Sequence, residues 1–513
     1  MTPAPPDIAV TPAALARTTG SGWRMGALLA LSAGLVAAFS LPSWGWWPLG
    51  VAGVAALPAL LADRGARGRA MVGVGFGAGF FVPGLWWMGE FNPVGAALVM
   101  VLETAFVGAA MAAVPPGRGR TVALPGALVL AEAVRGAIPF GGLPMAGLAL
   151  GQADAPMAGA ARIGGALLVL ALIAVAAVGV AELAARRWAP AALALGLAVA
   201  TTLAGAVAPD GGAGRPLHTA VVQGGGRRGF TGAEGDDPAE VLARHLAAGD
   251  DVQGPVDLVV WPEDVIDVEG PIGGQQEGAL LADAARRVDA TLVAGVVEDA
   301  GPDRFRNAAV AWGPDGAIVD RFEKVHRVPF GEYVPGRAFF DRFADLSPIP
   351  RDAIAGKGPG ILHTPAGDLG VMVSYEVFFA DRARGAARAG GRLLLVPTNA
   401  ASFSTSQVPS QQLATARLRA IETGRDLVQA APTGYSAVID NRGRVTMRST
   451  LGRRQVLHRT VQLRSGSTLY VQAGDSPVLA LAAVALAAGW AFRRRSRRPG
   501  RCAGPRPGRR PAC

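Results

Sequence analysis

Cysteine is nearly missing from this chain of 513 residues, which has only Cys502 and Cys513, both in its Arg-rich final segment. A disulfide framework and a buried catalytic thiol are therefore not expected. Lysine is equally scarce, because Lys324 and Lys357 are the only two lysines among 49 basic residues. Charged residues make up 17% of the chain and hydrophobic residues 50%. This balance excludes disorder as the main state and favours a membrane protein.

Long hydrophobic runs account for this composition. Runs of about 20 residues cross roughly 30 Å of hydrocarbon, and they predict seven spans before residue 210 and an eighth after residue 475. We interpret the first span as an anchor rather than a removed signal peptide, because no small-residue cleavage site closely follows its apolar part. The predicted spans are 24–42, 45–62, 71–89, 94–114, 121–139, 160–184, 189–208 and 476–492.

Arginines occur in alternate loops of the predicted membrane domain, 24–210. The loops near residues 43, 91 and 150 have no Lys or Arg apart from Arg162, at the edge of the sixth span. With segment 1–23 in the cytoplasm, the positive-inside rule places the tail 493–513 inside as well, and the segment between spans seven and eight outside. The arginines expected inside are Arg64, Arg67, Arg69, Arg118, Arg120, Arg186, Arg187, Arg493, Arg494, Arg495, Arg497 and Arg498.

The long segment 216–470 has a different composition from the spans. It carries 28 Lys and Arg against 30 Asp and Glu, a net charge of −2, so the rest of the chain supplies +12. A nucleic-acid partner is therefore disfavoured. Short apolar runs alternate with amphipathic ones, which predicts an α/β domain with covered sheets. The predicted strands are 217–223, 256–262, 290–297, 307–313, 368–375, 391–397, 427–431 and 435–440, and the helices are 276–288, 378–389 and 407–423.

Polar residues stand at the ends of several predicted strands, where catalytic side chains of α/β folds usually lie. Glu263 follows the apolar run 258–261 after a proline and is a candidate general base; the alternative is a helix-capping or surface glutamate. A lysine is a compact point charge suited to stabilising an oxyanion, which makes Lys324 and Lys357 of interest, although a solvated lysine is the usual alternative. For His326 a structural role is favoured over a catalytic one.

Two more strand ends carry candidate residues. Ser374 ends an apolar strand and precedes the helix 378–389, so its hydroxyl would lie where backbone N–H groups favour developing negative charge. An ordinary N-cap serine is the alternative. Asn399 follows the next strand and begins a polar loop that extends to Gln407. That loop either lines a pocket or is a plain connector.

The order of these motifs, in a domain flanked by seven spans and one, resembles the apolipoprotein N-acyltransferase family over nearly the whole chain. The residues that carry the resemblance are Trp261-Pro262-Glu263, Lys324-Val325-His326-Arg327-Val328-Pro329-Phe330-Gly331-Glu332, Ser374-Tyr375-Glu376, Glu132-Ala133-Val134-Arg135-Gly136, Phe140-Gly141-Gly142-Leu143-Pro144, Gly151-Gln152, Ala420-Ile421-Glu422-Thr423-Gly424-Arg425 and Ser436-Ala437-Val438-Ile439-Asp440.

The resemblance implies a polytopic α-helical membrane domain of about eight spans and an extracytoplasmic nitrilase-like α/β/β/α sandwich with a Glu-Lys-Cys triad. Its base falls on Glu263, its oxyanion-stabilising lysine on Lys324 and its nucleophilic cysteine on Ser374. Residues that support the pocket fall on Glu332, Glu376, Tyr375 and Asn399. The family's Asn-Asp-Ala-Trp-Phe loop reads Asn399-Ala400-Ala401-Ser402-Phe403 here, so its Asp and Trp are replaced.

The activity implied by the resemblance is transfer of an acyl chain in the bacterial plasma membrane. The donor is a phospholipid, and the acceptor is the N-terminal amine of a lipoprotein's S-diacylglyceryl cysteine. No metal or other cofactor is expected. One alternative is a catalytically impaired homologue that serves as a membrane scaffold, for example for a separate glycosyltransferase such as a polyprenol-phosphate mannose synthase. A membrane-tethered amidase is the least favoured reading, because eight spans exceed what a tether needs.

Overall fold

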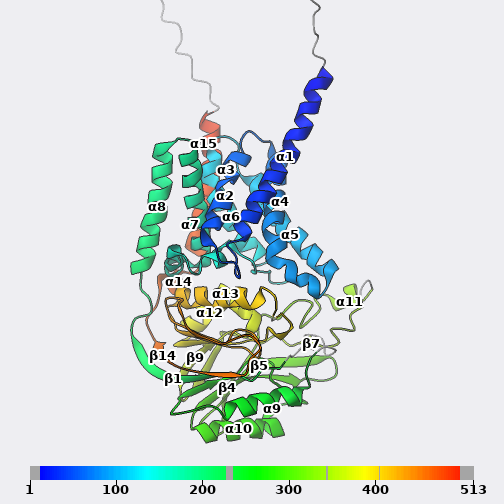
Figure 1. Ribbon diagram of the computed structural model, residues 1–513, viewed down its shortest axis with the longest axis vertical. Coiled ribbons are helices and arrows are strands. Elements are labelled where there is room, and N and C mark those ends of the chain that lie inside the picture. Colours follow the sequence, from blue (N-terminus) through cyan, green and yellow to red (C-terminus); the bar gives the residue numbers. More distant parts are fainter. Residues whose placement is uncertain (1–11, 227–234, 343–344, 404, 497–513) are drawn as a thin grey trace, which may run out of the picture.

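A computed structural model describes residues 12–226, 235–342, 345–403 and 405–496 of the chain. It consists of a helical bundle that is joined end to end with an α/β sandwich (Figure 1). The predicted combination of a helical region and an α/β sandwich is confirmed at this level. Residues 1–11 of the predicted N-terminal segment, most of the Arg-rich tail and both cysteines lie outside the described residues.

The bundle contains apolar helices from both ends of the chain. Among the described residues, five helical segments are long and apolar enough to cross a membrane, namely Ala66–Glu90, Pro93–Ala113, Pro156–Ala184, Trp188–Val207 and Ser476–Arg493. Its helices are α1 (Pro12–Ala38), α2 (Trp47–Ala55), α3 (Leu57–Leu60), α4 (Ala66–Leu85), α5 (Pro93–Ala113), α6 (Gly119–Arg135), α7 (Ala161–Ala184), α8 (Trp188–Val207) and α15 (Ser476–Ser496).

Three of the eight predicted spans do not fall on one of these five segments. Residues 24–38 form the described apolar part of α1. The predicted span 45–62 is divided between α2 and α3, where Pro58 lacks the N–H that would continue the first helix. The span 121–139 corresponds to α6, which ends at Arg135 and has only 17 residues.

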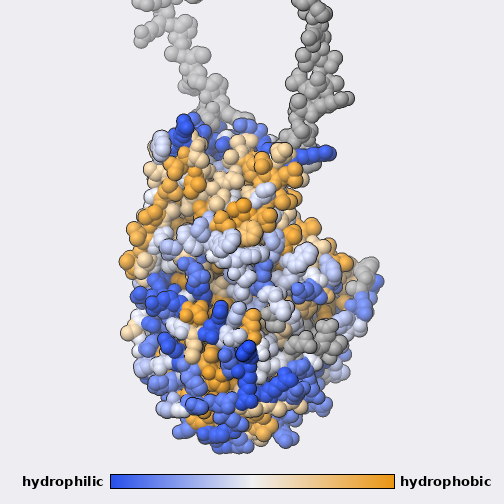
Figure 2. All heavy atoms as spheres, viewed as in Figure 1, coloured by the Kyte–Doolittle hydropathy of each residue, from blue (hydrophilic) through white to orange (hydrophobic). Residues whose placement is uncertain are grey.

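The arginine-rich loops gather at the end of the bundle opposite to the α/β sandwich (Figures 1 and 2). Arg120 Nε donates to the Pro58 carbonyl oxygen at 2.6 Å, and Arg69 Nη2 donates to the Ala112 carbonyl oxygen at 3.1 Å. In the face shown in Figure 2, an apolar band crosses the bundle between this charged end and the sandwich. This arrangement is typical of a protein whose bundle lies in a lipid bilayer.

Two sheets form the sandwich. The first has the order β14-β1-β2-β4-β5-β6, with β3 beside β4 and β7 beside β5, and the second has the order β13-β12-β11-β10-β9-β8. The strands of the first sheet are β1 (Gly214–Gln223), β2 (Leu258–Val260), β3 (Ile266–Val268), β4 (Thr291–Asp299), β5 (Arg304–Trp312), β6 (Ile318–Glu323), β7 (Asp352–Ala353) and β14 (Gln455–Arg464). Those of the second are β8 (Ile361–Thr364), β9 (Gly367–Val371), β10 (Leu393–Pro397), β11 (Leu427–Ala430), β12 (Ala437–Ile439) and β13 (Val445–Arg448).

The central strands of each sheet run parallel, as β1-β2-β4 and β9-β10-β11. Valine and leucine side chains of both sheets fill the space between them, among them Val221, Val260, Val371 and Leu395. Helices α9 (Pro238–Gly249) and α10 (Gln276–Val288) cover the outer face of the first sheet. Helices α12 (Ala380–Arg388) and α13 (Val408–Thr423) cover the second, which gives the four layers α/β/β/α.

Helix α13 also joins the sandwich to the bundle. Its Gln411 side chain is buried, donates to the Gly84 carbonyl oxygen at 2.9 Å and accepts from the Ala146 N–H at 3.1 Å. Glu422 accepts from the Ala166 N–H at 2.8 Å. One apolar core extends from the bundle into the layer formed by α12 and α13. The sandwich is therefore fixed to the bundle along one whole face.

All eight predicted strands and all three predicted helices of the sandwich overlap observed elements. The predicted helix 276–288 coincides with α10, and 407–423 coincides with α13 to within one residue. Elements that the sequence did not predict are β3, β6, β7, β8, β13, β14, α9, α11 (Arg337–Phe340) and α14 (Leu469–Ala473).

Candidate active site

Glu263 lies three residues beyond the end of β2, in the first sheet, and its side chain is buried. The neighbouring strand β4 passes very close to it at Gly295, where an added Cβ would lie 2.4 Å from the Glu263 Cα. Only glycine permits this approach. The next residue, Asp264, has a left-handed backbone with φ of 58°, so the chain turns sharply and directs the glutamate back toward the space between the strand ends.

Lys324 follows β6 directly and is buried between two carboxylates. Its Nζ donates to Glu263 Oε1 at 2.9 Å and to Glu332 Oε1 at 2.6 Å. Burial alone would lower the pKa of this lysine, but the two carboxylates outweigh it and hold the pKa above its ordinary value. Lys324 is therefore an ammonium at neutral pH. Two of its three N–H bonds are used by carboxylates, which leaves one donor for a substrate oxygen.

Asn307, on β5, completes this group and was not predicted from the sequence. Its Nδ2 donates to Glu263 Oε1 at 2.9 Å and to Glu332 Oε1 at 3.3 Å. Its carbonyl oxygen accepts from the Lys324 N–H at 2.9 Å. The amide therefore spans the same two carboxylates as the lysine. The only available sequence signal was that Asn307 is the first residue of the predicted apolar strand 307–313.

Ser374 lies three residues beyond the end of β9, in the second sheet, and is half-buried. Its φ is 51°, a left-handed conformation that costs a non-glycine residue about 1–3 kcal/mol. The Thr398 hydroxyl donates to Ser374 Oγ at 3.2 Å, and Gln412 Nε2 donates in turn to the Thr398 oxygen. Because the hydrogen of Thr398 is used in this way, the hydroxyl hydrogen of Ser374 remains for another acceptor.

The Glu376 carboxylate connects the turn at Ser374 to the segment after Lys324. It accepts from the Val373 N–H at 2.8 Å, from the Val325 N–H at 2.9 Å and from the His326 N–H at 3.1 Å. Complete burial raises the pKa of this carboxyl, although Arg382 and the N–H donors oppose the rise. One side chain therefore ties the turn that carries Ser374 to the segment that follows Lys324.

Asn399 connects the Ser374 region to Glu263. Its main-chain N–H donates to Glu263 Oε2 at 2.9 Å, and its side-chain amide donates to Asp264 at 3.3 Å. The preceding residue, Thr398, is the one that contacts Ser374. Strands β9 and β10 are parallel neighbours, so residues just beyond their ends meet at one edge of the second sheet, opposite the end of β2.

Tyr375 faces the bundle. Its hydroxyl donates to the Gly142 carbonyl oxygen at 3.0 Å, in the loop that follows α6. Seven residues were proposed from the sequence. Six of them contact one another around Lys324, either directly or through one neighbouring residue, and the seventh, Tyr375, connects this group to the membrane half. These are Glu263, Lys324, Ser374, Glu332, Glu376, Asn399 and Tyr375.

The remaining sequence candidates lie apart from this network or at its edge. Lys357 is exposed. The His326 ring stacks on Phe379 with centroids 4.1 Å apart, and burial lowers its pKa. Within the described ranges, no group of three or more His, Cys, Asp and Glu side chains could hold a metal ion.

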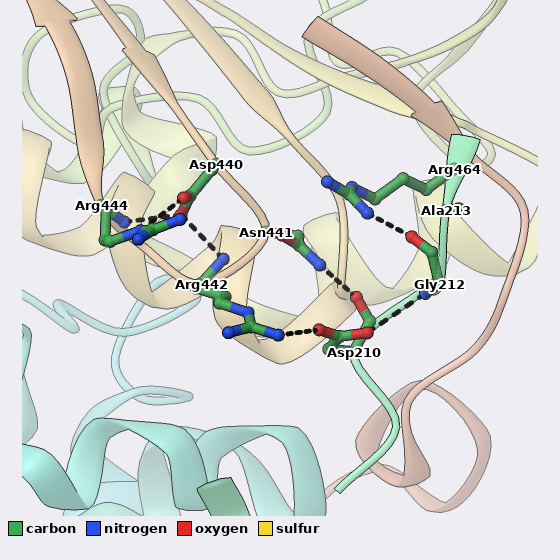
Figure 3. A pocket seen from close by; sticks show the side chains of 8 residues that line it. All are labelled: Asp210, Gly212, Ala213, Asp440, Asn441, Arg442, Arg444 and Arg464. Carbon is green, nitrogen blue, oxygen red and sulfur yellow. Dashed lines mark hydrogen bonds and ion pairs between the residues drawn. The ribbon is translucent and has the colours of Figure 1, made fainter. Parts of the chain in front are cut away.

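A separate polar pocket of about 360 Å³ lies between the segment after α8, the turn between β12 and β13, and the end of β14 (Figure 3). Arg442 pairs with Asp210 at 3.2 Å, Asn441 donates to the Asp210 carbonyl oxygen at 2.6 Å, and Arg464 donates to the Gly212 carbonyl oxygen. Its arginines are matched by carboxylates, and none of the candidate catalytic residues lines it. The contacts fasten the linker between bundle and sandwich.

Family models of known proteins match both the helical bundle and the α/β sandwich. Residues 33–179 match the family model of the apolipoprotein N-acyltransferase N-terminal domain, and residues 219–469 match that of carbon-nitrogen hydrolases. An apolipoprotein N-acyltransferase of Rhodopseudomonas palustris is 30% identical over 523 residues, which cover 91% of this chain and 94% of that one. The chain belongs to the apolipoprotein N-acyltransferase family.

Other members of this family match over different lengths. The Bradyrhizobium diazoefficiens protein is 29% identical over 92% of this chain and 96% of its own. The alignment with the Geobacter metallireducens protein is 35% identical but spans only 49% of that relative. Among solved structures, Saccharomyces cerevisiae Nit3, of the nitrilase superfamily, has a TM-score of 0.38 at 19% identity and covers 49% of this chain and 91% of its own.

Proposed function

We propose that this protein transfers an acyl chain from a membrane phospholipid to the N-terminal amine of an S-diacylglyceryl-cysteine lipoprotein, through an acyl-enzyme on Ser374. Membership of the apolipoprotein N-acyltransferase family supports the overall reaction. The observation that carries the mechanism is the buried Lys324, held at 2.9 Å by Glu263 and at 2.6 Å by Glu332 beside the strand ends that carry Ser374 and Thr398.

In the first half of the reaction, Glu263 takes the hydroxyl proton of Ser374 while Oγ bonds to the ester carbonyl carbon of the phospholipid. The carbonyl electron pair moves onto oxygen, and the third N–H of Lys324 stabilises this oxyanion. When the carbonyl re-forms, the bond to the glycerol oxygen breaks. The proton held by Glu263 passes to that oxygen, and a lysophospholipid leaves.

In the second half, the neutral α-amine of the lipoprotein attacks the acyl-enzyme carbonyl carbon. Lys324 again stabilises the oxyanion, and Glu263 takes a proton from the attacking nitrogen. The bond between the acyl carbon and Ser374 Oγ then breaks, and the proton on Glu263 returns to that oxygen. The product is an amide, and the enzyme regains its starting state.

Serine makes this cycle slower than cysteine would. A free thiol has a pKa of about 8.5 and is easily converted to a thiolate, whereas a serine needs a base at the moment of attack. Its oxygen ester is also less reactive toward an amine than a thioester is. Two features nevertheless favour the serine as nucleophile. One is the left-handed backbone at Ser374, and the other is the hydrogen bond from Thr398 that orients its hydroxyl.

The proposed topology has the sandwich on the outer face of the plasma membrane and all eight helical segments within the bilayer. The collection of arginines at the far end of the bundle supports this orientation. The contact between Tyr375 and Gly142 sets the residue after the nucleophile against the bundle. Both substrates, which carry acyl chains, would reach the site from the lipid surface.

The decisive experiment incubates the purified full-length protein with phospholipid and a synthetic diacylglyceryl-cysteine lipopeptide, followed by mass spectrometry of the peptide. A gain of one acyl chain that is lost in Ser374→Ala is the expected result. A gain that persists in Ser374→Ala would overturn the assignment of the nucleophile. Absence of transfer in the wild type, together with transfer by Ser374→Cys, would favour the impaired scaffold instead.

A further inference from the structure

The loop that follows α6, residues 136–147, touches both sides of the candidate active site. The Gly142 carbonyl oxygen accepts the hydroxyl of Tyr375, the residue after Ser374. On the other side, the Phe140 ring meets Phe330 edge to face with centroids 5.8 Å apart, two residues before Glu332. A displacement of this loop would therefore reach the nucleophile and a carboxylate that holds Lys324 at the same time.

A buried ionic cluster inside the bundle anchors the same loop. Arg135, the last residue of α6, donates through Nε to Glu103 Oε2 at 2.5 Å and through Nη1 to Glu132 Oε1 at 2.7 Å. Its remaining nitrogen, Nη2, donates to the Met145 carbonyl oxygen in the loop. The Arg135 carbonyl oxygen also accepts from the Leu143 N–H at 3.0 Å. The guanidinium thus holds two carboxylates and the loop backbone together.

Stability alone is a poor explanation for this cluster. Arg135 is 1% exposed and Glu103 is 2% exposed, and Glu103 stands at the middle of the apolar helix α5. Two carboxyl groups share one guanidinium. Charged groups are costly in such surroundings, and apolar side chains of similar size would stabilise a bundle as well or better. Unlike an apolar side chain, the planar guanidinium fixes the direction of its hydrogen bonds.

We propose that Arg135, held by Glu103 and Glu132, is a positioning residue that acts through the 136–147 loop and Tyr375 to orient the turn bearing Ser374. This inference rests on the proposed function, because the orientation of Ser374 matters only if Ser374 takes part in acyl transfer. Its test does not use the acyl-transfer reaction. The left-handed conformation of Ser374 is strained, and Tyr375 is held from the membrane side by the Gly142 carbonyl oxygen. The membrane half thus contributes to the geometry of the nucleophile.

The test measures the reactivity of residue 374 directly, without the acyl-transfer reaction. In a Ser374→Cys background that also carries Cys502→Ser and Cys513→Ser, the introduced thiol is the single one in the chain. Its alkylation by iodoacetamide is followed against pH in detergent-solubilised, full-length protein. Arg135→Gln, the milder Glu103→Gln and Tyr375→Phe are each added to this background. Only variants that retain the thermal unfolding midpoint of the background are compared.

We expect Arg135→Gln and Tyr375→Phe each to change the alkylation rate roughly 10-fold, because a small displacement of a reacting group changes its reaction rate strongly. Their effects should not add: the double variant should match Tyr375→Phe to within about twofold, because both changes break one connection. Glu103→Gln should shift the rate in the same direction by less. The matched control is Arg69→Gln, another buried bundle arginine, whose hydrogen bonds go to the carbonyl oxygens of Arg64 and Ala112; it should leave the rate unchanged.

Multiplicative effects of Arg135→Gln and Tyr375→Phe, or unchanged alkylation in both Arg135→Gln and Glu103→Gln, would overturn the proposal. If Arg135→Gln does not fold, Glu103→Gln combined with Tyr375→Phe provides the same comparison. Failure of the proposed function is a different result: it would leave alkylation coupled to Arg135 while the wild-type protein adds no acyl chain to the lipopeptide.

Discussion

The main-chain N–H of Asn399 donates a 2.9 Å hydrogen bond to Oε2 of Glu263, across the gap between the two sheets. The other oxygen of this carboxylate accepts from Lys324 and Asn307. These three donors hold the Glu263 side chain in place from three different parts of the sandwich. The carboxylate is oriented before any substrate arrives, which is what a proton acceptor in a buried site requires.

Replacing this carboxylate should remove the base without changing the shape of the site. We expect Glu263→Gln to lower acyl transfer by about 10²–10⁴-fold, the range that a general base contributes. Acylation of the lipopeptide, measured by mass spectrometry over time, gives the rate. Glu269→Gln, at an exposed position directly after β3, is the control and should retain full activity. A Glu263→Gln enzyme with the wild-type rate would contradict its role.

The two lysines offer a matched pair for the oxyanion prediction. Lys324→Ala should lower transfer by about 10²-fold or more and should also lower the free energy of unfolding by about 3–5 kcal/mol, because two buried carboxylates lose their partner. Lys357→Ala, at the exposed lysine, should do neither. Rates and thermal unfolding midpoints are measured on the same preparations. Equal behaviour of the two variants would remove Lys324 from the mechanism.

Exchanging the nucleophile atom should accelerate the reaction. Ser374→Cys should transfer acyl chains at least as fast as the wild type, because a thiol ionises more readily and a thioester reacts faster with an amine. Covalent acyl-enzyme trapped by acid and detected by intact-protein mass spectrometry should be stable to hydroxylamine at neutral pH in the wild type and labile under the same conditions in the variant. A slower Ser374→Cys enzyme would mean that the site is adapted to the smaller oxygen.

Acid should destabilise the sandwich through His245. This histidine is buried in α9, and burial lowers its pKa to about 4 from an ordinary value of 6.5. The unfolded chain therefore binds the proton more readily, so the free energy of unfolding falls as pH drops from about 6.5 to about 4. We expect the unfolding midpoint to follow this trend and His245→Asn to weaken it.

The control for this prediction is the exposed His363, whose pKa is raised by its hydrogen bond with Asp368. A raised pKa contributes stability below the unfolded value, so His363→Gln should not weaken the loss of stability in acid. If His245→Asn leaves the pH dependence unchanged, another group is responsible for it.

The sequence predicted those parts of the site that stand at the ends of buried strands. Glu263, Ser374 and Asn399 each follow an uninterrupted apolar run, and polar residues in that position are visible without a structure. Asn307 and Thr398 were missed for opposite reasons. Asn307 is the first residue of the predicted strand 307–313, and nothing local distinguishes it from an ordinary polar residue at the end of a strand. Thr398 was one polar residue among several in a loop, and its role depends on the pairing of β9 with β10.

The hydrophobic pattern also failed to predict the edge strands of the two sheets. In β14, charged and polar residues are interspersed with apolar ones, and five of the six residues before Val461 are partly buried or exposed. The strand is fixed by its antiparallel pairing with β1, residues far away in the chain. For the spans, composition identified the apolar segments, but their lengths were set by local breaks, such as the one between α2 and α3.

The shared core beneath α12 and α13 has a practical consequence for biochemistry. Side chains such as Leu413 and Ala416 pack in the same cluster as Phe80 and Leu85 of the bundle. A soluble fragment cut at residues 216–470 would expose that face to water, and exposed apolar faces of this kind promote aggregation. Kinetic work therefore needs the intact protein in detergent or nanodiscs. Many enzymes with a single membrane anchor can be studied after the anchor is removed. Here, removal of the bundle would take away the helices against which α12 and α13 pack.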